Sequence, residues 1–264
     1  MALITSRSNP HLKMVRALRQ RKARQETGLF IAEGIRHVGE AIEAGASIEA
    51  IYYASDRLAS PYARMLVSQA IVRDIPCFEL ADDLFESIAD KENPQGLLAV
   101  VRQPAQSLAN LNPERFPWGV ALVVPQDPGN LGAILRTVDA VGASGLILLD
   151  GGVDPFHPSA VRASMGTIFW YPVVSASLTD FEGWISHHAY HVYGTSAHAA
   201  TDYRHLSAYE RPCILLMGNE REGLTSEQAA MCEQTVALPM LGRATSLNLA
   251  IATGVMLYRM LEKM

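Results

Sequence analysis

The chain has 264 residues, of which 49% are hydrophobic and 19% are charged. This composition excludes wholesale disorder, which requires few apolar residues and a high net charge. No apolar run approaches the roughly 18 residues that a membrane-spanning helix needs, and residues 1–7 lack the apolar stretch of a secretory signal. Three widely spaced cysteines favour a reduced, cytoplasmic protein without disulfides.

The charge of the chain is distributed unevenly. The net charge is −5, from 22 basic and 27 acidic residues, but residues 1–25 carry a charge of +7 and the remaining 239 carry −12. An asymmetry of this kind indicates a basic interaction arm. The seven basic residues of this arm are Arg7, Lys13, Arg16, Arg19, Arg21, Lys22 and Arg24.

The first hundred residues predict alternating helices and strands. A basic helix over residues 10–24 begins after the start signal Ser8-Asn9-Pro10. Hydrophobic periodicity predicts further helices at 35–44, 58–70 and 81–88, and strands at 48–53, 75–80 and 96–101. Residues 103–117 are rich in Pro, Asn and Gln and show neither helical nor strand periodicity, which predicts a linker.

A second alternation begins at Val120. Its first strand, Val-Ala-Leu-Val-Val, is continuously apolar, which favours a parallel sheet covered on both faces. The pattern predicts further strands at 145–149, 171–174, 191–195, 213–217 and 235–238, and helices at 130–141, 158–164, 179–188, 226–231 and 247–261. These elements predict an α/β domain of about 150 residues.

Several familiar signatures are missing from the sequence. There is no G-x-G-x-x-G after a strand and no G-x-x-x-x-G-K-[ST], so a standard dinucleotide fold and a P-loop enzyme are disfavoured. No cysteine pair has metal-ligand spacing, and His187, His188 and His191 are interpreted as a surface cluster with no metal.

Three segments remain, each just after a strand, where open α/β sheets bind ligands. In the first, residues 126–137, Asn130 is a candidate helix cap. Arg136 has two alternatives, which remain open at this point. It could pair with Asp139 on the same helix, or it could be partly buried and directed at a phosphate near a helix N-terminus.

The second and third segments also allow a structural or a functional interpretation. In residues 217–224, Gly218 could shape a turn, with Glu220 satisfied by nearby backbone. Alternatively, Gly218 could admit a ligand, with Glu220 holding a polar group of it. In residues 238–250, Ser246 is the expected N-cap of the last helix, and Asn248 would need polar partners if it were buried. No His or Asp pattern accompanies Ser246, so a hydrolase triad is disfavoured.

Together, and in this order, the three segments resemble the SpoU–TrmH family of RNA ribose 2′-O-methyltransferases in the SPOUT trefoil-knot superfamily. The resemblance covers roughly residues 120–259. Two departures are Leu238 in place of Ile and Leu249-Ala250 in place of Val-Ser. The matching residues are Asn130, Gly132, Arg136 and Thr137, residues 218–224, residues 238–240, Gly242 and residues 246–248.

The N-terminal part is similar to the ribosomal-protein-like α/β domain that binds substrate in this family. The matching residues are Arg7-Ser8-Asn9-Pro10, Phe30-Ile31-Ala32-Glu33-Gly34 and Asn93-Pro94-Gln95-Gly96. The resemblance therefore implies an RNA substrate-binding domain at 1–103, a linker at 104–117 and a SPOUT methyltransferase domain with a mostly parallel sheet and a C-terminal trefoil knot at 118–264. It assigns the basic arm to an RNA-facing module.

The resemblance implies methyl transfer from S-adenosylmethionine to a ribose 2′-hydroxyl of structured RNA, ribosomal RNA or transfer RNA, by a homodimer. Arg136 of one subunit would reach toward cofactor bound by the other. The family's polar catalytic positions are Arg136, Asn130, Glu220, Ser246 and Asn248. The implied cofactor-binding residues are Thr195, Ser196, Ala197, Met217, Gly218, Leu238, Met240, Ser246 and Leu247.

Arginine is a poor general base because its pKa exceeds roughly 12. We therefore expect Arg136 to hold the target phosphate and orient the 2′-hydroxyl. Asn130 and Glu220 would position Arg136 and the ribose. Two other hypotheses are a catalytically idle RNA-binding protein on the same scaffold and a small-molecule-binding α/β protein. The five intact polar positions favour the enzyme.

Overall fold

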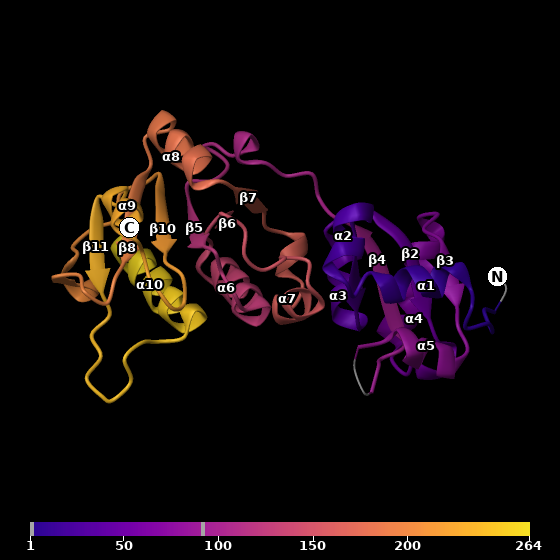
Figure 1. Ribbon diagram of the computed structural model, residues 1–264. Coiled ribbons are helices and arrows are strands. Elements are labelled where there is room, and N and C mark those ends of the chain that lie inside the picture. The colour runs from indigo at the N-terminus through magenta and orange to yellow at the C-terminus, as the bar shows by residue number, and fades with distance from the viewer. Residues whose placement is uncertain (1–2, 91–92) are drawn as a thin grey trace. The chain divides into compact units, whose positions relative to one another are not determined.

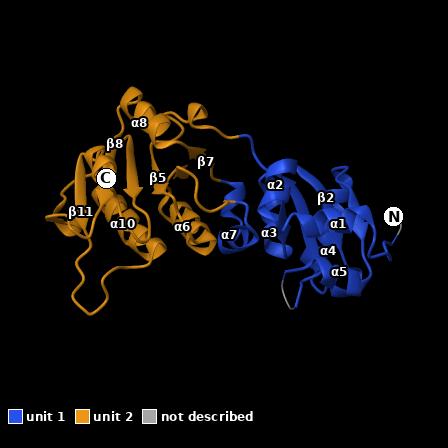
Figure 2. Ribbon diagram, viewed as in Figure 1, with its two compact units in different colours: residues 1–105, 156–170 blue, residues 106–155, 171–264 orange. Residues whose placement is uncertain are grey.

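A computed structural model describes residues 3–90 and 93–264. Packing divides the chain into two units (Figure 1, Figure 2). Unit 1 comprises residues 1–105 with 156–170, and unit 2 comprises residues 106–155 with 171–264. The predicted boundaries at 1–103, 104–117 and 118–264 stay predictions. The structure adds that residues 156–170 pack with the N-terminal unit.

Unit 1 is built on a four-stranded sheet in the order β1-β4-β2-β3. The central strand β4 is antiparallel to β1 and β2, and it is buried at every residue except Arg102. The strands are β1 (Leu29–Glu33), β2 (Ile48–Tyr53), β3 (Cys77–Glu79) and β4 (Leu97–Arg102). Strand β1 was not predicted, although its Leu-Phe-Ile-Ala run is apolar and buried.

Helices on the faces of this sheet complete unit 1. They are α1 (Pro10–Ala17), α2 (Arg21–Thr27), α3 (Ile35–Glu43), α4 (Pro61–Val72), α5 (Asp82–Ile88) and α7 (Pro158–Ala163), with short 3₁₀ turns at Ser55–Arg57 and Thr167–Phe169. One core cluster joins Leu12 and Val15 of α1 to Phe85 of α5 and Leu98 of β4. The 156–170 segment docks through aromatic contacts, since the Phe30 and Phe156 ring centroids are 4.7 Å apart.

The predicted single helix at 10–24 is wrong, because the chain forms two helices separated by residues 18–20. Asn9 caps α1 by accepting from the His11 amide, in line with the predicted start. At the break, the Arg24 guanidinium donates to the carbonyl oxygens of Leu18 and Arg19, each at 2.9 Å. Arg24 is 1% exposed. The buried guanidinium thus satisfies carbonyl groups that a continuous helix would have bonded internally.

Unit 2 contains a seven-stranded sheet in the order β7-β6-β5-β10-β8-β11-β9. Every adjacent pair is parallel, which confirms the predicted parallel sheet. The strands are β5 (Trp118–Val123), β6 (Leu146–Leu149), β7 (Val173–Ala176), β8 (His191–Thr195), β9 (Thr201–Asp202), β10 (Cys213–Met217) and β11 (Gln234–Ala237). The two-residue strand β9 was not predicted, because it is too short to show an apolar pattern.

Helices and turns surround this sheet. They are α6 (Pro128–Val141), α8 (Leu178–His187), α9 (Ser226–Ala230) and α10 (Leu249–Lys263), with 3₁₀ turns at Leu108–Asn110 and Tyr203–His205. Phe181 and Trp184 of α8 join a core cluster with Ala121 and Val123 of β5. Helices α6 and α10 pack on each other, and a Cβ at Gly254 would lie 3.8 Å from Thr137.

The three clustered histidines do not form a metal centre in this structure. Within residues 3–90 and 93–264, no group of three or more metal-ligating side chains is present. His191 instead contacts Glu233, with 2.6 Å between Nδ1 and a carboxylate oxygen. Over the same described residues, no helix has the length and apolar character needed to cross a membrane.

Replacing Arg24 should destabilise the fold. The change Arg24→Met keeps an apolar stem but leaves buried carbonyl groups without their donor, so we expect the free energy of unfolding to fall by about 2–4 kcal/mol. Lys22→Met, at an exposed position on the same helix, should change it by less than about 0.5 kcal/mol. Urea denaturation of both variants measures this, and equal stabilities would contradict the structural role of Arg24.

Candidate functional site

The predicted motifs lie at one edge of the unit 2 sheet. Because β5, β10, β8 and β11 are parallel neighbours, their carboxyl ends lie together and the loops that follow them converge. The chain continues from β5 to β6 on one side of β5, whereas β10 lies on the other side and pairs with β8. The β5–β10 boundary is therefore a topological switch point, the usual ligand position in open α/β sheets.

Two of the motif loops are joined directly by hydrogen bonds. The backbone amide of Gln126 donates to both carboxylate oxygens of Glu220, at 3.1 and 3.2 Å. The Asn219 side-chain amide donates to the Val124 carbonyl at 3.1 Å. The carboxylate of Glu220 thus accepts from a backbone amide, as the structural alternative predicts, and that amide belongs to the first motif.

The end of β5 has an unusual backbone. Val124 has φ of +43°, a left-handed conformation that is rare for a β-branched residue. Such strain costs on the order of 1–3 kcal/mol and collects at functional sites. The carbonyl of Val124 accepts from the side chains of both Asn219 and Gln126. The strain therefore accompanies the point where the first two motifs meet.

The first and third motifs are joined by a pair of asparagines. The Asn248 side-chain amide donates to the side-chain oxygen of Asn130 at 2.9 Å. Asn248 also caps α10, because its side-chain oxygen accepts from the amides of Ala250 and Ile251. The structure brings Asn130 and Asn248 together although 117 residues separate them in the chain.

Both predicted helix caps are corrected by the structure. The cap of α6 is Asp127, whose carboxylate accepts from the Asn130 amide at 2.7 Å, and not Asn130 itself. The cap of α10 is Asn248 and not Ser246. Asn248 is exposed, so its partners do not serve to satisfy a buried amide. Because Asp127 caps α6, the side chain of Asn130 is left for its contact with Asn248.

Arg136 lies exposed on α6, so the partial burial that one alternative predicted is not observed. The alternative pairing with Asp139 is not observed, since that carboxylate accepts from the Tyr171 hydroxyl at 2.9 Å. Within the described residues, Arg136 makes no ion pair, and its guanidinium is available to an anionic ligand.

The predicted cofactor-binding residues lie in three of these loops. At the ends of β8 and β10, the Thr195 hydroxyl contacts the Met217 sulfur at 3.5 Å, and Met217 is 2% exposed. The Ser196 amide donates to the Val236 carbonyl of β11 at 3.0 Å. Leu238 and Met240 are half-buried, whereas Ala197, Ser246 and Leu247 are exposed. In the described chain, no hydrogen bond joins Ser246 to the other predicted site residues.

Gly218 is required by close backbone packing. The loop after β10 returns on itself, with Asn219 and Gly223 exchanging backbone hydrogen bonds of 3.1 and 2.9 Å. A Cβ at Gly218 would lie 2.2 Å from the Gly223 carbonyl carbon and 2.4 Å from the Leu224 nitrogen. The glycine therefore sets the path of the loop that carries Glu220.

The seven basic residues of the N-terminal arm differ in their surroundings. Arg7, Lys13, Arg21 and Lys22 are exposed. The guanidinium groups of two half-buried residues are bonded within unit 1: Arg16 donates to Ser87 at 2.7 Å, and Arg19 donates to the Ala89 carbonyl. Arg24 is buried, so we exclude it from the surface proposed below to contact RNA.

Three contributors to the site were missed by sequence reasoning: Gln126, Asp127 and Asn219. Asp127 could have been found, because an Asp immediately before a proline matches an N-cap followed by a proline at N1. Gln126 contributes its backbone amide, which leaves no signal in a single sequence. Asn219 belongs to the matching residues 218–224, but the sequence does not show its long-range contact with Val124.

The comparisons with known proteins agree with this geometry. The SpoU rRNA Methylase family profile matches residues 117–258, which contain all three motifs. The chain belongs to the SpoU rRNA Methylase family. A second profile, the MRM3-like substrate binding domain, matches residues 9–99.

Two curated relatives of this SpoU-family chain align over nearly its whole length. A 23S rRNA (uridine(2479)-2′-O)-methyltransferase of Streptomyces viridochromogenes is 33% identical and covers 97% of this chain and 90% of its own. A 23S rRNA (guanosine(2553)-2′-O)-methyltransferase of Bacillus subtilis is 29% identical and covers 98% of this chain and 99% of its own.

Solved structures confirm the SPOUT methyltransferase fold of the chain. The AdoMet-bound rRNA methyltransferase from Sinorhizobium meliloti matches with a TM-score of 0.90 and 37% identity, covering 98% of this chain and 97% of that one. The Streptomyces viridochromogenes SpoU methyltransferase AviRb in complex with AdoMet matches with a TM-score of 0.86 and 31% identity, covering 96% and 98%. The trefoil knot itself stays a prediction.

A methyl group at Gly218 should unfold or distort the second motif. For Gly218→Ala we expect the free energy of unfolding to fall by about 2 kcal/mol or more, because the neighbouring atoms are backbone and cannot rotate away. Gly183→Ala is the matched control: its Cβ meets nothing within 4 Å, and alanine favours the interior of α8 by about 0.5–1 kcal/mol. Thermal denaturation compares the two, and a harmless Gly218→Ala would refute the tight turn.

Proposed function

We propose that this SpoU-family chain transfers a methyl group from S-adenosylmethionine to a ribose 2′-hydroxyl of ribosomal RNA. The observation that carries the proposal is that the Asn130–Asn248 pair and the Gln126–Glu220 contact join the three motifs at one edge of the parallel sheet, where the helix that carries Arg136 begins. Ribosomal RNA is favoured because the two relatives that align over nearly the full length act on 23S rRNA by name.

The loops after β8, β10 and β11 fit an adenosine-containing cofactor. They combine the apolar side chain of Met217 with the exposed residues 241–248, and so offer both apolar and polar groups. The residues that would hold it are Thr195, Ser196, Ala197, Met217, Gly218, Leu238, Met240, Ser246 and Leu247. When bound, S-adenosylmethionine supplies an electrophilic methyl group on a sulfonium sulfur.

The polar residues have distinct proposed roles. The guanidinium of Arg136 binds the phosphate next to the target ribose in a bidentate manner, which places the 2′-oxygen for attack. Arg136 stays protonated throughout, so the hydroxyl proton passes to phosphate or solvent. Asn130, Asn248 and Glu220 fix the loop and helix start that present Arg136, and Ser246 completes the pocket wall.

We also propose a homodimer, with Arg136 of one subunit reaching the cofactor held by the other. The support is an apolar face on α10: Ile251, Tyr258 and Leu261 are 57%, 56% and 44% exposed. Their spacings of seven and three residues place them on one side of the helix. Exposed apolar patches of this kind mark interfaces.

A cytoplasmic location is also proposed. Cys77, Cys213 and Cys232 are free, and burial raises the pKa of the Cys213 thiol to about 12, which keeps it protonated and unreactive.

The variant Arg136→Ala should abolish methyl transfer and leave cofactor binding intact. Losing the phosphate contact should lower the rate of labelled methyl transfer to ribosomal RNA by about 100-fold or more. S-adenosylmethionine affinity, measured by calorimetry, should stay within about twofold. Arg115→Ala, at an exposed arginine of the same unit, is the control. Near-normal transfer by a folded Arg136→Ala protein would refute the assignment.

A charge on the apolar face of α10 should separate the subunits. We expect Ile251→Asp to shift the mass measured by light scattering from dimer to monomer, because an unpaired carboxylate would be buried in the interface. Met65→Asp replaces a 43%-exposed apolar residue of α4 and should leave the mass unchanged. A monomeric unsubstituted protein would contradict the dimer.

The exposed basic residues of unit 1 should account for much of the salt dependence of RNA binding. Replacing Lys13, Arg21 and Lys22 together by Ala should reduce the slope of log affinity against log salt by about 2 to 3, at 0.7–0.9 per charge. Filter binding to ribosomal RNA from 50 to 200 mM salt measures it, again with Arg115→Ala as control. An unchanged slope would place the RNA-binding surface elsewhere.

A further inference from the structure

Unit 1 has an open depression that the proposed reaction does not use. Its volume is ≈ 420 Å³, within the range of small-ligand sites. It lies along α3, beside the start of α4. The residues that line it are Ile35, Arg36, Glu40, Glu43, Tyr62 and Gln95.

An exposed aromatic ring forms one wall of this depression. Tyr62 is 47% exposed, and its ring lies against the bare backbone of Gly39. A Cβ at Gly39 would lie 2.6 Å from the Tyr62 hydroxyl oxygen and 3.4 Å from Cζ. The glycine thus lets the ring lie close to α3. An exposed, well-supported aromatic ring in a substrate-binding unit is a surface on which a base can stack.

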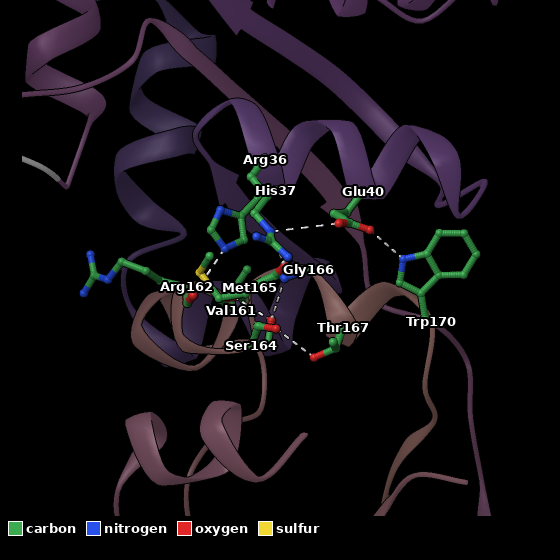
Figure 3. Close-up of polar contacts among 10 residues, drawn as sticks. All are labelled: Arg36, His37, Glu40, Val161, Arg162, Ser164, Met165, Gly166, Thr167 and Trp170. Atoms are coloured by element: carbon green, nitrogen blue, oxygen red, sulfur yellow. Dashed lines mark hydrogen bonds and ion pairs between the residues drawn. The ribbon is translucent and has the colours of Figure 1, made fainter. Parts of the chain in front are cut away.

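A second exposed ring is hydrogen-bonded to one of the residues that line the depression. Trp170 is 49% exposed, and its indole nitrogen donates to a Glu40 carboxylate oxygen at 2.8 Å (Figure 3). The other carboxylate oxygen of Glu40 is 4.0 Å from Arg36 Nε, which itself donates to the Met165 carbonyl at 2.9 Å. Arg36 and Glu40 are therefore held in place by hydrogen bonds before any ligand binds.

The remaining polar groups match the edge of a base better than a phosphate. The Gln95 side-chain oxygen accepts from the Ile35 amide at 3.2 Å, so the amide NH₂ is left as a donor. Glu43 is exposed and, like Glu40, carries an acceptor carboxylate. Two carboxylates repel a phosphate, but they accept hydrogen bonds from the exocyclic amine of adenine, cytosine or guanine.

We propose that this depression binds one unstacked nucleobase of the RNA substrate, stacked on Tyr62 and contacted at its edge by Gln95 and Glu43. The site rests on the proposed function in that the ligand is RNA. It differs from the basic arm in reading a base and not the phosphate backbone, and it favours a base with an exocyclic amine over uracil.

Tryptophan fluorescence offers a direct test with single-stranded RNA 10-mers. The other two tryptophans, Trp118 and Trp184, are 1% and 7% exposed, so quenching reports mainly on Trp170. Oligoadenylate should quench the fluorescence and oligouridylate should bind more weakly. For Tyr62→Ala the affinity for oligoadenylate should fall by roughly 5- to 150-fold, the effect of one lost base stack. Tyr62→Phe should restore it, and Val72→Ala on α4 should leave it unchanged.

A folded Tyr62→Ala protein with unchanged affinity would overturn the site, and equal binding of both oligonucleotides would overturn the edge contacts. If Tyr62→Ala fails to fold, Tyr62→Leu serves the same purpose, because it removes the ring and keeps apolar bulk. Methyl transfer by the unsubstituted protein is measured in parallel. If the unsubstituted protein transfers methyl groups normally and Tyr62→Ala keeps its affinity for oligoadenylate, only this base site is refuted. If the unsubstituted protein binds oligoadenylate as expected but transfers no methyl group, only the proposed function is refuted.

Discussion

Parallel pairing of β5 with β10 is the constraint on which the candidate site depends. In this register Met217 lies beside Leu122, so both strands end at nearly the same level. The first two motifs follow these strand ends, and the side chain of Glu220 can therefore reach the Gln126 amide. A shift of one residue would turn every side chain of β10 to the opposite face and separate the two loops.

The third motif joins the site through a helix end. Asn248 caps α10 and contacts Asn130 near the start of α6, and these two helices pack against each other. One asparagine thus has a structural and a positioning role. Arg136 lies further along α6, about two and a half turns after the Asp127 cap, so its placement follows from the same helix start.

The segment that leads from β6 into unit 1 is hydrogen-bonded to the residue just before the first motif. The Val153 amide donates to the Pro125 carbonyl at 2.8 Å, and a Cβ at Gly152 would lie 2.5 Å from that same oxygen. The chain then continues into residues 156–170, which pack with unit 1 although they lie within the residues matched by the methylase family profile. The sequence gives no local sign of this, because the segment is an ordinary short helix.

Hydrophobic periodicity predicted most of the helices and strands, and strands β8 and β10 have the predicted bounds. The helix caps were not predictable in the same way, because Asp127, Asn130, Ser246 and Asn248 are all good capping residues and backbone conformation selects among them. Charge counting included Arg24 in the basic arm, since a sequence does not show which guanidinium is buried. The ordered motifs indicated the candidate site, but the contacts that join its loops became visible only in three dimensions.

The position of the transferred methyl group tests the central claim most directly. Ribosomal RNA incubated with the protein and S-adenosylmethionine can be digested to nucleosides and analysed by mass spectrometry. The account predicts one additional nucleoside, with the methyl group on the ribose 2′-oxygen. In the undigested RNA, the linkage that follows this nucleotide should resist alkaline hydrolysis. A methyl group on a base, or none on RNA, would contradict it.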